Sequence, residues 1–107
     1  MTYKIRFHPK VATDLQVIAD IIANHSGVTE ATHKLVHIQD TAFRLADNPE
    51  KGSAQSEAGS AIRVIPAGRK GIIAFEIDEN TTTVFVLAVA YGGTEWLSKI
   101  EGRRAYP

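Results

Sequence analysis

Residues 61–91 read AIRVIPAGRKGIIAFEIDENTTTVFVLAVAY, and this stretch decides the fold. It contains three apolar runs, at about 61–65, 71–78 and 83–91, which are rich in the β-branched and aromatic residues typical of strands. The runs are separated by Gly-Arg-Lys and by Asp-Glu-Asn-Thr, and both are turn sequences. The stretch therefore predicts a three-stranded antiparallel meander.

The last run is apolar on both faces, so the sheet needs a cover on each side. Side chains alternate between the two faces of a strand, which divides the run into a bulky set and a small set. We expect the bulky set to pack against helices: Phe85, Leu87, Val89 and Tyr91. The small set should form a shallow apolar trough on the opposite face: Val84, Val86, Ala88 and Ala90, with Ile72 and Ala74 of the middle strand. An open apolar trough on a soluble protein is typical of a binding surface.

The residues before the meander predict one strand and two helices. Residues 3–7 alternate apolar with basic side chains, as a half-buried strand does, and Pro9 favours a helix start directly afterwards. The first helix is expected over residues 10–26, and the second from an N-cap at Thr29 to Asn48-Pro49. Because the turn between them is so short, the two helices should lie antiparallel.

Each predicted helix carries a main apolar stripe and a weaker one. The main stripes should face the core: Val11, Leu15, Ile18 and Ile22, then Ala31, Leu35, Ile38, Ala42 and Leu45. The weaker stripes should pack the helices against each other: Val17, Ile21, Val36 and Phe43. Residues 94–100 predict a short C-terminal helix. The chain is thus expected to be one α+β domain over residues 1–107.

Composition narrows the classes of function. The chain has 107 residues and no cysteine, which excludes disulfides, thiolate metal sites and cysteine nucleophiles. Its 12 basic and 12 acidic residues balance, whereas proteins that bind phosphate backbones are usually basic. The N-terminus does not resemble a secretory signal, and no run approaches the ~20 apolar residues that span a bilayer. These features predict a cytoplasmic protein that does not contact membranes, and no cofactor or metal is expected.

Short motifs along most of the chain resemble the RelE/ParE superfamily of toxins from type II toxin–antitoxin modules. The helical part carries His8-Pro9-Lys10, Ala12, Asp14-Leu15, Ile18, Ser26-Gly27, Leu45-Ala46, Pro49 and Gly52. The meander carries Ile62-Arg63, Gly68-Arg69, Phe75-Glu76-Ile77-Asp78-Glu79 and Val86-Leu87-Ala88-Val89. The resemblance implies the same order of strand, helical hairpin and meander, and a toxin that a cognate antitoxin holds inactive.

The superfamily contains two activities, and the sequence departs from one of them. RelE-like members cut mRNA on the ribosome with basic residues and often a C-terminal tyrosine, whereas ParE-like members poison DNA gyrase. RNA cleavage needs a base, an acid and cations for the phosphorane. Arg63 and Tyr91 are the candidate catalytic residues, with no third group beside them. The ParE-like branch is therefore favoured. A RelE-like endoribonuclease that acts on the ribosome and its mRNA remains open, as does a degenerate, non-toxic module that binds antitoxin.

The candidate residues for binding antitoxin or target combine the trough with nearby cations and aromatics. They are Arg63, Arg69, Lys70, Ile72, Ala74, Val84, Val86, Ala88, Ala90, Tyr91 and Trp96. For Arg63 the alternative is an ion pair with Glu76 across the sheet. An open trough also predicts a homodimer or a toxin–antitoxin hetero-oligomer. Arg103-Arg104 is interpreted as a basic tail.

Overall fold

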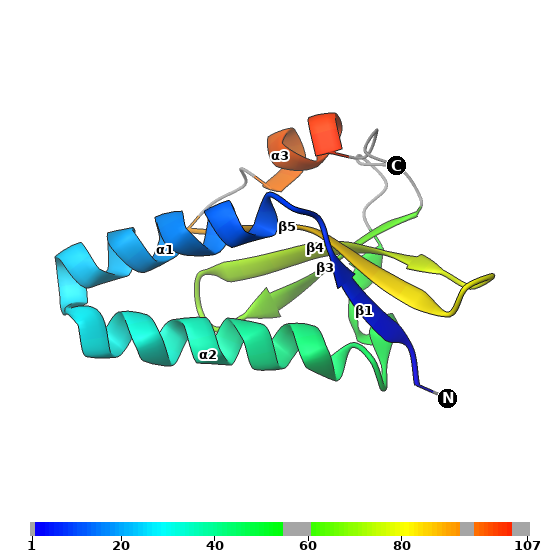
Figure 1. Ribbon diagram of the computed structural model, residues 1–107, viewed down its shortest axis with the longest axis horizontal. Coiled ribbons are helices and arrows are strands. Elements are labelled where there is room, and N and C mark those ends of the chain that lie inside the picture. Colours follow the sequence, from blue (N-terminus) through cyan, green and yellow to red (C-terminus); the bar gives the residue numbers. More distant parts are fainter. Residues whose placement is uncertain (1, 55–60, 93–95, 104–107) are drawn as a thin grey trace.

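The computed structural model describes residues 2–54, 61–92 and 96–103. Figure 1 shows a sheet with the long helices on one side and a short C-terminal helix on the other. The elements in chain order are β1 Lys4–Phe7, α1 Val11–Ser26, α2 Val28–Arg44, the 3-10 helix η1 Pro49–Lys51, β2 Ser53–Ala54, β3 Ile62–Ala67, β4 Gly71–Asp78, β5 Thr83–Tyr91 and α3 Trp96–Arg103. The predicted α+β fold, with its helical hairpin and antiparallel meander, is confirmed.

The sheet has the strand order β1-β5-β4-β3-β2. The meander strands pair antiparallel as predicted, and two-residue β2 adds to the edge at β3. Strand β1 pairs parallel with β5, with Phe7 opposite Val86. The N-terminal strand β1 therefore lies beside the C-terminal strand β5. The two edge strands of the open sheet are β1 and β2.

The α1–α2 hairpin covers one face of the sheet through the predicted main stripes. Val11, Ile18 and Ile22 of α1 and Ala31, Ile38 and Ala42 of α2 are buried in one core cluster with Phe75 of β4. Gly27 alone links the helices. Its φ of 93° is a conformation that glycine adopts without a Cβ penalty. The second helix starts at Val28 directly after it, so the expected N-cap at Thr29 is wrong.

The weaker helical stripes do not pack the helices together. Val17, Ile21, Val36 and Phe43 are exposed, the last by 56%, so that prediction is wrong. Phe43 instead meets Phe7 of β1 edge-to-face, with ring centroids 5.7 Å apart. The helices instead meet through their main stripes, whose buried residues belong to one core cluster with the sheet.

A β-bulge in β5 changes which side chains face the hairpin. Ala74 pairs with Ala88, but the next residue of β4, Phe75, pairs with Val86, so Leu87 is the extra residue. The bulge shifts the alternation by one. Val84 and Val86 therefore join the hairpin-side core, while Phe85 and Leu87 face α3, the reverse of the prediction. Beyond the bulge, Val89 and Tyr91 face the hairpin as predicted.

The predicted open trough is covered in this structure. Ala74 and Ala88 are fully buried, and they share a core cluster with Ala90, Ile62, Leu87 and the α3 residues Trp96 and Ile100. Three alanines make this face shallow, and the Trp96 ring and the Ile100 side chain fill the space above them. The expectation of an open trough is therefore wrong, because α3 is the second cover of the sheet.

Gly52 has no room for a side chain, which gives a prediction about stability. A Cβ at this position would lie 2.5 Å from Cζ of the buried Phe75 ring. Since Gly52 has ordinary extended angles, the cost of Gly52→Ala is steric, and we expect a loss of about 1–3 kcal/mol in unfolding free energy. Urea unfolding measures it. Gly102→Ala is the control: its Cβ meets nothing within 4 Å, and it should stabilise α3 slightly. Equal effects of the two changes would contradict the steric explanation.

Candidate functional site

Beyond the bulge, β5 has no strand neighbour on its β1 side, and its backbone groups bind side chains there. The pairing of β5 with the β1 segment ends at one hydrogen bond, in which the His8 N–H donates to the Val86 carbonyl at 2.8 Å. The Val89 N–H then donates to Oδ2 of Asp14 at 3.0 Å, and the Leu87 carbonyl accepts from Nη1 of Arg103 at 3.1 Å. Asp14 comes from α1 and Arg103 from α3, so both helices are fixed to the bulge.

The same two side chains form a buried ion pair. Arg103 Nη1 lies 2.6 Å from Asp14 Oδ2, and Nη2 lies 2.9 Å from Oδ1, which is the bidentate geometry of strong pairs. Lys99 Nζ adds a contact to Oδ1 at 3.0 Å. The Asp14 side chain is only 2% exposed and that of Arg103 is 11% exposed. We refer to Asp14, Lys99 and Arg103 as the Asp14 cluster.

Electrostatics at the Asp14 cluster favour the charged carboxylate. Burial by itself raises the pKa of Asp14, but the hydrogen bonds from Arg103, the Val89 N–H and Lys99 outweigh it and lower the pKa. Arg103 is thus a structural residue, and its interpretation as part of a basic tail is wrong. Arg104 lies outside the described residues. A signal existed in the sequence, because Asp14 stands within the apolar stripe of α1, where a carboxylate needs a partner.

His8 is a second buried titratable group near this region. Its Nδ1 accepts the Lys10 N–H at 3.1 Å, and its ring lies 6.2 Å from that of Phe85. Burial and, secondarily, the positive charge of Arg103 lower the pKa of His8. The neutral imidazole is therefore the form that the fold favours.

Both shifts predict that the protein loses stability on acidification. In each case the folded pKa lies below the unfolded value, so the unfolded chain binds protons first and the stabilisation present at higher pH is lost. The loss should begin as the pH falls through 6.5 because of His8, and continue below 3.8 because of Asp14. Urea unfolding midpoints across this range measure it. A His8→Gln variant should lose only the drop in stability that begins near pH 6.5. A urea midpoint that rose as the pH fell would contradict the lowered pKa of both groups.

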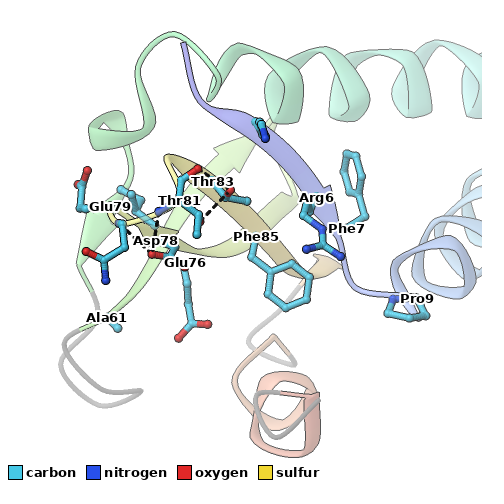
Figure 2. A pocket seen from close by; sticks show the side chains of 13 residues that line it. Arg6, Phe7, Pro9, Ala61, Glu76, Asp78, Glu79, Thr81, Thr83 and Phe85 are labelled. Carbon is cyan, nitrogen blue, oxygen red and sulfur yellow. Dashed lines mark hydrogen bonds between the residues drawn. The ribbon is translucent and has the colours of Figure 1, made fainter. Parts of the chain in front are cut away.

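A hollow of 880 Å³ lies on the α3 side of the sheet, next to the β4–β5 turn (Figure 2). We refer to it as the Phe85 hollow. The register places Arg6, Phe85 and Glu76 in one row across β1, β5 and β4, so the aromatic ring separates a cation from a carboxylate. Lys4 also lines the hollow on the basic side, and Asp78 and Glu79 line it on the acidic side. Its charges are mixed, and they do not select one class of ligand.

A second hollow, of 600 Å³, lies at the other end of β4. We refer to it as the Tyr91 hollow. Four segments form it: the end of α1, the start of α2, the β3–β4 turn and the end of β5. Its described lining carries the cations Lys34, Arg69 and Lys70, together with His25 and one acidic residue, Glu30. The sequence predicted part of this lining, since Arg69, Lys70 and Tyr91 were among the candidate binding residues.

The two candidate catalytic residues are far apart. Arg63 lies opposite Phe75, and Tyr91 lies opposite Gly71, four residues further along β4. Four residues along a strand and two strand spacings across the sheet place the two backbone positions about 16 Å apart, which does not bring the two side chains together. Arg63 Nη1 donates to the Gly52 carbonyl at 2.7 Å, on the hairpin side of the sheet. The alternative given for Arg63, an ion pair with Glu76, is wrong, because Glu76 lies on the opposite face.

The buried polar groups and acidic clusters of the described part of the chain add no further site. Within it, no buried side-chain nitrogen or oxygen lacks a hydrogen-bond partner, and no three His, Cys, Asp or Glu side chains are placed to hold a metal ion. None of its helices is both long and apolar enough to cross a membrane. The remaining predicted binding residues pack beneath α3 or belong to it: Ile72, Ala74, Ala88 and Ala90 of the trough, and Trp96.

Residues 5–96 match the family model described as the ParE toxin of the type II toxin–antitoxin system parDE. The chain belongs to the ParE toxin family. The predicted membership in the RelE/ParE superfamily and its ParE-like branch is confirmed. The match begins within β1 and ends at the first residue of α3, and it includes Asp14, the lining of the Tyr91 hollow and all of the Phe85 hollow except Lys4.

Solved structures with a similar fold come from the same superfamily. The chromosomal ParDE system from P. aeruginosa matches with a TM-score of 0.73 at 16% identity, over 86% of this chain and 98% of that one. The complex RelBE2 from Mycobacterium tuberculosis matches with a TM-score of 0.65 at 22% identity, over 85% and 99%. A mutant of free RelE from E. coli gives 0.67 at 11% identity, over 98% and 99%. No curated protein matches the chain. These likenesses show that this ParE family member has the fold of that group.

Proposed function

We propose that this ParE family member is the toxin of a type II toxin–antitoxin module, that a cognate antitoxin neutralises it, and that it acts in the cytoplasm by inhibiting DNA gyrase. Membership in the ParE toxin family carries the proposal. Two of the similar structures, the ParDE system and the RelBE2 complex, are toxin–antitoxin systems, which supports an antitoxin as partner.

The geometry of the candidate residues favours a toxin that binds over one that cleaves RNA. An endoribonuclease needs its acid, base and cations around one phosphate. Arg63 and Tyr91 lie about 16 Å apart by strand spacing, and Arg63 is engaged by the Gly52 carbonyl. Inhibition by binding to a large enzyme requires no such cluster. Gyrase is the target that the ParE branch suggests, and a role in plasmid stabilisation follows if the module is plasmid-borne.

The test compares the two targets in one culture. The chain is expressed without antitoxin, and pulse labels follow DNA and protein synthesis together. We expect DNA synthesis to fall first, and the purified chain to increase the amount of DNA that gyrase holds cleaved. Gyrase without the chain is the control. Protein synthesis that falls first, with cleaved mRNA, would favour the RelE-like activity. Cells that grow normally would favour the non-toxic binding module.

A further inference from the structure

We infer that the Tyr91 hollow is the site where an acidic segment of the antitoxin binds. This inference rests on the proposed toxin–antitoxin function and adds to it the place and the chemistry of contact. The chain as a whole has no net charge, yet three cations, Lys34, Arg69 and Lys70, line one hollow against one acidic residue, Glu30, among the described residues.

The cations of this hollow are available to a ligand. Within the described ranges, the side chains of Arg69 and Lys70 have no hydrogen-bond or ion-pair partner, and both residues are exposed. Lys34 Nζ has only a long contact, 3.9 Å, to Oε2 of Glu30, and both of these side chains are more than a third exposed. Because like charges around one hollow repel each other, a carboxylate placed between them is favoured.

The backbone that carries Arg69 and Lys70 is held in place before any ligand arrives. Ala67 pairs with Gly71 at the base of the turn, and Gly68 takes a φ of 81° that suits glycine. The Gly92 N–H donates to the Lys70 carbonyl at 2.8 Å, which fixes the turn to the end of β5. A Cβ on Gly71 would collide with the Ala67 carbonyl, so the turn has little freedom. A fixed turn reduces the ordering cost of binding.

The lining favours a polypeptide over nucleic acid. Ile21, Ile22 and Tyr91 give the hollow an apolar part, which suits an acidic residue flanked by apolar ones. A phosphate backbone would need a basic surface that continues along the molecule. Instead the Phe85 hollow, at the opposite end of β4, is mixed in charge, with Glu76, Asp78 and Glu79 facing Lys4 and Arg6, so the basic surface does not continue there.

The test measures the affinity of the purified cognate antitoxin for the full-length chain. The variant Arg69→Glu/Lys70→Glu should weaken binding about tenfold or more at roughly 50 mM salt, and less at roughly 300 mM, where surface charges are screened. The matched control Lys10→Glu/Lys51→Glu changes the net charge equally. Lys10 precedes the sixteen-residue helix whose far end lines the hollow, about 23 Å away. The control should bind antitoxin within about twofold of wild type. The tenfold loss expected of the Arg69/Lys70 variant, about 1.4 kcal/mol of binding free energy, is clearly larger than that limit.

The outcomes separate the inference from the function on which it rests. If wild type and the Arg69/Lys70 variant bind antitoxin equally, or if the control loses as much affinity, the inference is overturned and the proposed function stands. If wild type does not bind the antitoxin, both are overturned. An unchanged urea midpoint verifies that the variant is folded, as expected for exposed turn residues. As a second variant, Arg69→Gln/Lys70→Gln should show a smaller loss with the same dependence on salt.

Discussion

Replacing Asp14 with alanine is expected to lower the free energy of unfolding by about 3–5 kcal/mol, the range found when one partner of a buried ion pair is removed. The carboxylate accepts from Arg103, Lys99 and the Val89 N–H. Its loss leaves the guanidinium, 11% exposed, without its anion and a strand N–H without an acceptor. Urea unfolding with tryptophan fluorescence measures the effect directly, because Trp96 stands at the start of the helix that the cluster holds.

The control for this prediction lies on the same helix. Asp20 accepts an exposed hydrogen bond from Gln16, so Asp20→Ala should cost less than about 0.5 kcal/mol. A double-mutant cycle of Asp14→Ala with Arg103→Ala should give a coupling energy of about 1–3 kcal/mol. Independent, additive effects would show that Asp14 and Arg103 do not stabilise each other.

Replacing Ala88 with aspartate is expected to cost about 4 kcal/mol or more at neutral pH, because it places a carboxylate in a fully buried position. Ala88 lies opposite Ala74, beneath Trp96 and Ile100. Burial raises the pKa of the introduced carboxyl, so the loss should shrink as the pH falls toward 4. Wild type changes in the opposite direction, since acid destabilises it through His8 and Asp14. Urea midpoints at neutral pH and near pH 4 measure both trends.

Two variants separate this effect from a general effect of charge. Ala12→Asp adds the same carboxylate to the exposed first turn of α1, where a negative charge is favourable. It should leave the free energy of unfolding almost unchanged. Ala88→Ser should cost much less than Ala88→Asp, because a hydroxyl carries no charge. If Ala88→Asp were as stable as wild type, α3 would not cover this face in solution, and the trough would be open as the sequence suggested.

Much of the fold follows from periodicity in the sequence. The repeat of Val11, Ile18 and Ile22 predicts the buried face of α1, and the turn sequences predict the β3–β4 and β4–β5 connections. These features are local, so a window of a few residues contains the information. The ParE family, too, was identified from the order of such short motifs.

The errors have a common physical cause, which is contact between distant segments. No local pattern marks Leu87 as a bulge, because the extra residue is visible only against its partner strand β4. That one residue moved Val84 and Val86 to the hairpin side. Likewise Asp14 and Arg103 are 89 positions apart, and their pairing requires the complete three-layer arrangement. The candidate site was predicted best where it is local, at Arg69 and Lys70 on one turn.

The parallel pairing of β1 with β5 has a consequence for biosynthesis. The first strand cannot find its neighbour until residues 83–86 have left the ribosome, and Asp14 has no partner until Arg103, 89 positions after it, has been made. At the usual speed of translation, about 5–20 residues per second, this interval lasts about 4–18 s. During it the nascent chain has an unfinished sheet and an unpaired acidic residue in its core. Harm to the cell would therefore begin only after Arg103 has been translated, and an antitoxin already present could meet the newly folded protein at that moment.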